Sequence, residues 1–202
     1  MARKIIPEKV EEAKEKIIYA ALNVIIEDGL TKFTLSKVAG KAGITKAAIY
    51  WYFSNKEDLL YYMASSFREA FIESAKQVAA QPISSERKIE ALIMSLENDD
   101  THKKCFLPIK IFIELYSADH EIKKIIKDIY TEYIDILQGI FEEAINKKEI
   151  KTSVSALSLA KFLMATLDGC TIQDEITESP RMDYQEVFRL FVDFFTNPRG
   201  VQ

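Results

Sequence analysis

Apolar residues recur three and four positions apart along most of this chain, which is the period of amphipathic α-helices. Between Glu8 and Asp28, for example, they include Ile17, Ala20 and Val24, and Gly29 follows as a stop signal. No segment shows the strict alternation of apolar and polar residues that is typical of a strand. The pattern therefore predicts an all-α fold of about nine helices, at residues 8–28, 35–42, 45–52, 55–80, 84–97, 109–117, 119–147, 155–176 and 183–196.

The segment from residue 34 to residue 59 combines two short helices with a tight glycine turn. Thr34 and Thr45 stand where each helix needs an N-cap, and threonine oxygens accept from the first amides of a helix. Gly43 stands where a helix ends in a left-handed residue, a conformation that glycine adopts without a Cβ penalty. Ser54 and Glu57 have the spacing of a capping box for the next helix. Two helices joined in this way predict a helix-turn-helix, whose second helix enters the major groove of DNA.

The distribution of charge supports this interpretation. The whole chain has a net charge of −4, but residues 1–56 hold ten basic and six acidic residues, so the remainder carries −8. From Gly29 to Lys56 there are five lysines and no Asp or Glu. A lysine-rich run can simply be a solvated surface, but here it coincides with the pair of short helices. Contacts to phosphates supply most of the non-specific affinity for DNA, so the coincidence favours DNA binding.

Residues 43–59 read GITKAAIYWYFSNKEDL, and an upstream stretch reads KIIYAALNVIIEDGLTKFTLSKVAGKAG. Together they resemble the DNA-binding domain of TetR/AcrR-family transcriptional regulators over roughly residues 12–60. Ala47 stands where that family often has glycine, which should not disturb a helix. Beyond residue 60 the resemblance is one of architecture. It implies a DNA-binding domain at 1–54 and a helical effector-binding and dimerisation domain at 55–202, in a ligand-responsive repressor that binds a palindromic operator as a dimer.

We expect the DNA contacts to come from the two short helices and the start of the next. Lys46 would reach a phosphate or a guanine edge, and small alanines beside it permit contact with a thymine methyl. The resemblance implies that Tyr50 contacts a phosphate, whereas Trp51 is either a groove contact or a packing residue. Ile49 and Phe53 are expected to face the core. The expected DNA-binding residues are Thr34, Ser36, Lys37, Thr45, Lys46, Ala47, Ala48, Tyr50, Trp51, Tyr52 and Lys56.

The region after residue 60 is dense in aromatic residues, most of which are expected to be core. Family members enclose a ligand cavity in this region, and such cavities are apolar with a few polar groups. An acyl-CoA is the first expectation for the effector, and a hydrophobic cation, which the local charge of −8 favours, is the second. The expected effector-binding residues are Phe67, Phe71, Met94, Phe112, Tyr116, Tyr130, Tyr133, Phe162, Thr166 and Gln173.

The last two predicted helices resemble the dimer seam of the family. The final helix contains VFRLFVDFF, more large apolar residues than one face of a terminal helix needs for a monomer core. We therefore expect a two-fold homodimer interface formed by Leu163, Leu167, Phe188, Phe191, Val192 and Phe195.

The sequence has no motif for an enzyme, a cofactor or a metal ion: GxxxxGK[ST], HExxH and GxSxG are absent. Cys105 and Cys170 lie far apart in the sequence and have no histidine partners at metal-binding spacing. A disulfide between them is one alternative, but two reduced cysteines in the core are favoured. No apolar run has the length of a signal sequence or a membrane span, so we expect a cytoplasmic protein. A DNA-binding architectural protein without a ligand pocket is the remaining alternative.

Overall fold

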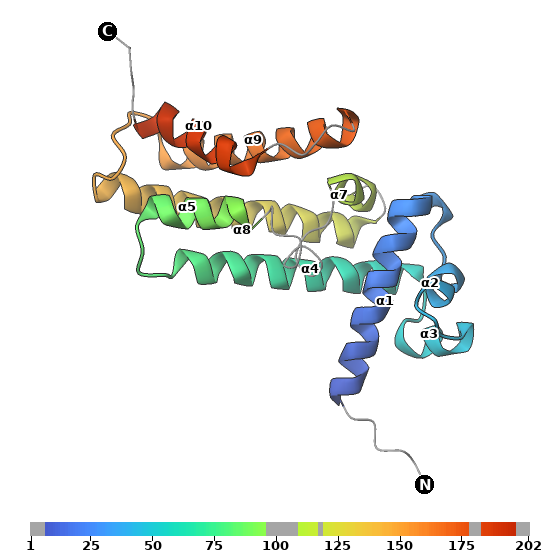
Figure 1. The fold of residues 1–202 in the computed structure, drawn as a ribbon. Helices are drawn as coiled ribbons and strands as arrows, with labels where there is room; N and C mark the ends of the chain where they lie inside the picture. Colours follow the sequence, from blue (N-terminus) through green and yellow to red (C-terminus); the bar gives the residue numbers. More distant parts are fainter. Residues whose placement is uncertain (1–6, 96–108, 117–118, 178–182, 197–202) are drawn as a thin grey trace. The chain divides into compact units, whose positions relative to one another are not determined.

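A computed structural model of the chain describes residues 7–95, 109–116, 119–177 and 183–196. In these ranges the fold is all-helical and has no strand, which confirms the predicted fold class (Figure 1). The predicted helices are present with ends within a few residues of those expected, and the predicted polar break at 98–104 lies outside the described residues. The elements are α1 (Pro7–Asp28), the short 3-10 helix η1 (Leu30–Lys32), α2 (Leu35–Lys41), α3 (Lys46–Tyr52), α4 (Lys56–Ala79), α5 (Ser85–Met94), α7 (Ile109–Tyr116), α8 (His120–Asn146), α9 (Ala156–Thr177) and α10 (Tyr184–Thr196).

The chain forms two compact units. Unit 1 comprises residues 1–66 and 110–126, and unit 2 comprises residues 67–109 and 127–202. Unit 1 therefore contains α1 to α3, the first half of α4 and nearly all of α7. The domain boundary expected at residue 54 stays a prediction. The compact unit extends to residue 66 and also includes residues 110–126, which no sequence pattern joined to the N-terminal helices.

The core of unit 1 is built from the inner faces of its helices. Val38, Ile49, Phe53 and Met63 are almost fully buried, and Ile17, Ala21, Ile25, Phe33, Leu59, Leu60, Ile111 and Leu115 join them. Gly29 (φ 73°) ends α1 and Gly43 (φ 69°) lies in the turn between α2 and α3. Both occupy the left-handed region that favours glycine, as the sequence predicted for the turn.

The N-caps of the short helices are as predicted, but that of α4 is displaced by one residue. Thr34 Oγ1 accepts from the Lys37 amide at 3.3 Å, and Thr45 Oγ1 accepts from the Ala48 amide at 3.1 Å. At the start of α4, Asn55 Oδ1 accepts from the Asp58 amide at 2.7 Å. Asp58 Oδ2 in turn accepts from the Ser54 amide at 2.8 Å. The capping pair is thus Asn55 and Asp58, and the prediction of Ser54 and Glu57 was wrong.

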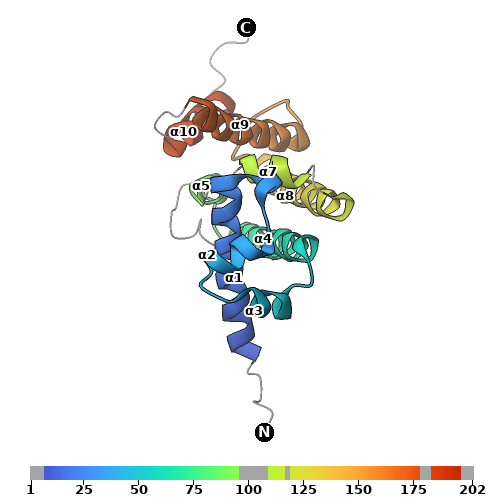
Figure 2. The same cartoon turned by 90° about the vertical axis from the view of Figure 1, so that its right-hand side faces the viewer.

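Unit 2 has a separate core made by α5, α8, α9, α10 and the second half of α4. Leu137, Phe141, Ala144 and Leu163 are fully buried within it, and Cys170 is buried as well. In both views α9 and α10 lie side by side (Figures 1 and 2). The side chain of Glu149, just after α8, accepts from the amide of Ser85 at the start of α5, and so joins two segments that are 64 positions apart.

Four of the residues expected at the dimer interface belong to this core. Leu163 is 0%, Leu167 4%, Phe188 9% and Phe191 6% exposed within the single chain. In the single chain their side chains pack within the core of unit 2, so their place in a dimer interface stays a prediction. Val192 is partly buried, and the side chain of Phe195 lies outside the described residues.

Among the described helices, none is long and apolar enough to cross a membrane.

Candidate nucleic-acid interface

The short helix α3 presents one polar and aromatic face to solvent. Ile49 and Phe53 are buried, as expected, and anchor α3 to unit 1. Tyr50 is 49% exposed and Trp51 is 59% exposed, and Lys46, which starts the helix, is also at the surface. The Trp51 ring meets the Tyr52 ring edge to face, with centroids 4.8 Å apart. Trp51 is therefore a surface residue rather than part of the core.

The remaining expected contacts lie on the same unit. Thr34, Ser36 and Lys37 stand at the exposed start of α2, and Thr45 and Ala47 are exposed before and within α3. Ala48 and Tyr52 are partly buried. Each threonine oxygen is engaged as an N-cap acceptor, but a hydroxyl can also donate, so the cap leaves that capacity intact.

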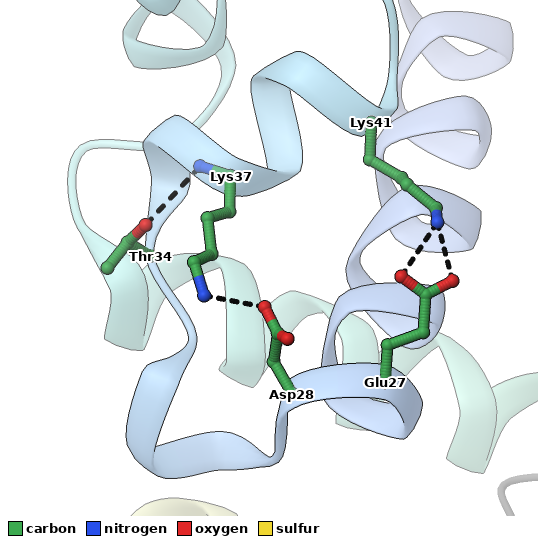
Figure 3. Close-up of polar contacts among 5 residues, drawn as sticks. All are labelled: Glu27, Asp28, Thr34, Lys37 and Lys41. Atoms are coloured by element: carbon green, nitrogen blue, oxygen red, sulfur yellow. Dashed lines mark hydrogen bonds and ion pairs between the residues drawn. The ribbon is translucent and has the colours of Figure 1, made fainter.

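Two lysines of the run are paired with carboxylates of α1 (Figure 3). Lys37 Nζ lies 2.5 Å from Asp28 Oδ2, and Lys41 Nζ lies 2.5 Å from Glu27 Oε1. The hydrogen bond from Lys37 lowers the pKa of Asp28 and so favours its charged form. Sequence reasoning missed both pairs because Glu27 and Asp28 lie just before the run, and folding places them beside it. The positive charge of α2 is therefore partly neutralised within unit 1.

Lys56 is also engaged within the unit. Its Nζ donates to the carbonyl oxygen of Leu30 at 3.0 Å and lies 5.6 Å from the centre of the Phe33 ring. Its position at the start of α4 is as predicted, but its ammonium supports the α1–α2 turn in addition to any contact with DNA. The other two lysines between Gly29 and Lys56, Lys32 and Lys46, are exposed.

A carboxylate from α7 contacts the same turn. Glu114 Oε2 accepts from the amide of Leu30 at 2.6 Å, although the two residues are 84 positions apart. Glu114 is partly buried, and its helix neighbour Leu115 is fully buried in unit 1. No sequence signal pointed to this contact.

The expected effector residues divide into buried and exposed groups. Within unit 2, the Phe71 ring stacks on Phe67 (5.4 Å) and on Tyr133 (4.8 Å), which is fully buried. Met94, Tyr130 and Thr166 are partly buried in the same unit. Phe162 is 52% exposed, Tyr116 is 45% exposed and Gln173 is also exposed. None of these three side chains therefore lines an enclosed site within its own unit. The side chain of Phe112 lies outside the described residues.

A polar pair and a cavity in unit 2 were not predicted. Tyr130 Oη donates to Asp168 Oδ1 at 3.2 Å. Burial raises the pKa of Asp168. The pKa of Tyr130 is raised mainly by burial and secondly by the negative charge of Asp168.

A cavity of about 120 Å³ is lined by Ser84, Glu86, Ile89, Glu149, Ile150, Phe188, Phe191 and Val192, none of which was expected to bind the effector. In the described part of the chain, no group of three His, Cys, Asp or Glu residues could hold a metal ion.

Comparison with known proteins gives matches over both units. The family model described as "Bacterial regulatory proteins, tetR family" matches residues 17–63, and "YsiA-like protein, C-terminal region" matches residues 67–185. The "Fatty acid metabolism regulator protein" of Bacillus subtilis is 31% identical over 76% of this chain and 78% of its own length. The "HTH-type transcriptional repressor BepR" of Brucella suis is 25% identical over 78% of each.

A solved structure agrees with these matches. The transcriptional regulator FadR from Bacillus subtilis in complex with stearoyl-CoA superposes with a TM-score of 0.71 at 26% identity, over 92% of this chain and 98% of that one. The exposed face of α3 and the glycine turn before it fit the family that these matches indicate. This chain belongs to the TetR family of bacterial transcriptional regulators.

Proposed function

We propose that this protein is a dimeric repressor that binds a palindromic DNA operator and releases it when an acyl-CoA binds in unit 2. The observation that carries the DNA-binding part is the exposed face of α3. It presents Lys46, Tyr50 and Trp51 from a helix whose opposite face, at Ile49, is fully buried. A rigid helix with exposed donors is what base and phosphate contacts in a major groove require.

The exposed residues of α3 also indicate how DNA would be read. Lys46 supplies a charge for a phosphate or a guanine edge, and Ala47 offers a methyl group for a thymine contact. The helix contains no arginine, asparagine or glutamine, which are common readers of guanine and adenine through paired hydrogen bonds. Specificity would then rest largely on the shape and flexibility of the operator.

Apolar side chains on α9 and α10 supply the surface for a dimer. Leu157, Phe162, Ile172, Ile176 and Leu190 are each at least 38% exposed. Water-exposed aliphatic and aromatic side chains on two adjacent helices mark an interaction surface. A two-fold pairing of this surface would match the symmetry of a palindromic operator. They lie on the same two helices as the four buried residues that the sequence indicated.

The acyl-CoA assignment rests on the relatives and on the aromatic cluster of unit 2. A Bacillus subtilis relative of this chain is named for fatty acid metabolism, and a solved Bacillus subtilis regulator that this chain resembles is bound to stearoyl-CoA. In this chain, Phe67, Phe71 and Tyr133 form a stacked apolar cluster against which an acyl chain could pack. Each buried CH₂ contributes about 0.8 kcal/mol, so a chain of ten carbons contributes roughly 8 kcal/mol before ordering costs.

The proposal is tested by titration of an operator complex. A duplex is first selected from a random pool with the full-length protein, labelled, and bound at saturating protein. Stearoyl-CoA should then lower the fluorescence anisotropy of the duplex, whereas free CoA, which lacks the acyl chain, should not. The reciprocity of coupling requires that operator DNA also weaken stearoyl-CoA binding by the same factor. Release by free CoA, or no release by any acyl-CoA, contradicts the acyl assignment.

A hydrophobic cation is the second candidate, and Asp168 favours it. This carboxylate is partly buried in unit 2 and has Tyr130 as a hydrogen-bond donor. A buried carboxylate is unfavourable unless a positive charge pairs with it, and a cationic ligand would supply that charge. Release of the operator by a lipophilic quaternary ammonium ion, with no response to stearoyl-CoA, would select this alternative.

A further inference from the structure

The turn between α1 and α2 is held on both sides by side chains from elsewhere in unit 1. At Leu30, the backbone amide donates to Glu114 Oε2 at 2.6 Å and the carbonyl oxygen accepts from Lys56 Nζ at 3.0 Å. Glu114 comes from α7 and Lys56 from the first turn of α4. Both polar groups of one backbone residue are therefore bound by charged side chains that are 84 and 26 positions away.

The amide of Leu30 needs such an acceptor. Leu30 is the first residue of η1, and the first amides of a helix have no partner inside the helix. Gly29, which precedes it, is the N-cap and has no side chain to accept from this amide. A carboxylate suits the position, because an anion near a helix N-terminus is stabilised by the free amides there. Glu114 thus supplies the cap that the turn itself lacks.

Glu114 is itself held in place. Ile111 and Leu115, which lie three residues before and one residue after it on α7, are 1% and 0% exposed in the core of unit 1. An ideal Cβ built on Gly29 would lie 3.8 Å from Glu114 Oε1, so the carboxylate packs directly against the turn. A side chain fixed by its helix can fix the backbone that it contacts.

The position of the α1–α2 turn determines where α2 starts. Only Phe33 and Thr34 separate η1 from α2, and Thr34 is the N-cap of α2. The helix α2 is also tied to the end of α1 by the pairs of Lys37 with Asp28 and of Lys41 with Glu27. A shift of the turn would therefore displace α2 and, beyond the turn at Gly43, α3.

We propose that Glu114 is a positioning residue for DNA recognition: by accepting from the Leu30 amide it fixes the α1–α2 turn and thereby holds α3 in the orientation that reads the operator. Glu114 itself contacts no DNA. The proposal concerns the geometry of the reading helix and is independent of which effector binds in unit 2, but it does rest on sequence-specific DNA binding.

Three full-length variants test the proposal against the duplex selected with the wild-type protein. Glu114→Ala removes the acceptor, Glu114→Gln keeps an oxygen that can accept from the amide, and Glu121→Ala makes the same charge change at an exposed residue of unit 1. Anisotropy titrations would measure affinity for the selected duplex and for a scrambled duplex of the same length. Hydrogen exchange of the Leu30 amide would be followed by NMR.

Glu114→Ala should bind the selected duplex about tenfold more weakly, because an unsatisfied backbone amide allows the turn to rearrange. Its affinity for the scrambled duplex should be unchanged, since phosphate contacts tolerate a misplaced helix. Glu114→Gln should stay within about threefold of the wild type, since a neutral acceptor still forms the bond. Glu121→Ala should behave as the wild type. A purely structural role would lower both affinities together.

The outcomes are distinct. Wild-type affinity of Glu114→Ala for the selected duplex overturns the proposal, and so does an equal loss in Glu114→Gln. If Glu114→Ala does not fold, the hydrogen exchange rate of the Leu30 amide provides the test. Rapid exchange of this amide in the wild-type protein overturns the proposal. Slow exchange in both the wild type and Glu114→Gln supports it. Failure of the wild-type protein to select any duplex would instead contradict sequence-specific DNA binding.

Discussion

The ammonium of Lys88 is buried in unit 2, and its Nζ lies 2.8 Å from Glu143 Oε2. Lys147 donates to the other oxygen of the same carboxylate at 2.6 Å. The hydrogen bonds from Lys147 and then from Lys88 lower the pKa of Glu143 from 4.5 to about 2. A buried ammonium needs this partner, so Glu143 connects α5 to α8 across the core.

Glu143→Gln should lower the stability of the protein in a pH-dependent way. The native pKa lies below the ordinary value, so the stabilisation is complete above about pH 4.5 and is lost as the pH falls towards 2. Thermal unfolding should show a midpoint several degrees below that of the wild type at pH 7, and the difference should disappear at pH 2. Glu142→Gln, at the exposed neighbouring position, is the control and should change little at either pH. A constant difference at all pH values would contradict the assignment.

Lys46→Ala and Tyr50→Ala should weaken operator binding without changing the fold. Both side chains are exposed on α3, so their loss removes contacts with DNA and not packing. For Lys46→Ala, the slope of log affinity against log salt concentration should fall by about one, as expected for a lost phosphate contact. Lys124→Ala, an exposed lysine of α8, is the charge-matched control. Unchanged affinity in both α3 variants would count against this helix as the reading element.

Two glycines of the helix-turn-helix should respond oppositely to alanine. Gly43 has φ 69°, so Gly43→Ala should destabilise unit 1 by about 1 kcal/mol through backbone strain. Gly40 lies within α2, and an added Cβ would meet no atom within 4 Å. Gly40→Ala should therefore stabilise the protein by about 0.5–1 kcal/mol. Urea denaturation of the pair checks the prediction, and equal signs of the two changes would refute it.

Phe162→Glu should convert the dimer to a folded monomer. Phe162 is 52% exposed on α9, so a charge there is tolerated in the monomer but is unfavourable in an apolar interface. Light scattering with sedimentation measures the mass, and circular dichroism checks the helix content. Ile26→Glu, at a position 50% exposed on α1, is the control and should leave the mass unchanged. A Phe162→Glu dimer of wild-type affinity would show that the interface lies elsewhere.

Asp168→Asn should stabilise the protein at neutral pH. Burial raises the pKa of Asp168, so the group favours the native state at low pH and this contribution is lost as the pH rises through the native pKa. The variant should therefore have a higher thermal midpoint than the wild type at pH 7 and no advantage near pH 3. Asp135→Asn, which is exposed on α8, should change little. If a hydrophobic cation is the effector, Asp168→Asn should also weaken its binding.

The sequence predicted the helices closely because caps, glycines and apolar spacing act locally. Thr34, Thr45 and Gly43 each perform the role that their position indicates. The N-cap of α4 shows the limit of such patterns. Ser54 with Glu57 and Asn55 with Asp58 both have capping spacing, and only the backbone geometry selects the second pair.

The sequence was less informative about which face of a helix is buried and which distant residues meet. Helix α9 carries apolar residues around much of its circumference, so spacing did not distinguish the inward Leu163 from the outward Phe162. The contacts of Glu114 with Leu30 and of Lys37 with Asp28 depend on how separate segments pack. Local sequence carries no signal for contacts of this kind.

The membership of α7 in unit 1 has a consequence for how this protein is made. Residues 110–126 contribute Ile111, Leu115 and the Glu114 acceptor to a unit that otherwise ends at residue 66. During translation, the N-terminal helices emerge first, but the amide of Leu30 has no carboxylate and the core has a gap until α7 leaves the ribosome. The DNA-binding unit therefore matures only after more than half of the polypeptide has been synthesised, and a nascent chain stalled before α7 should not yet recognise its operator.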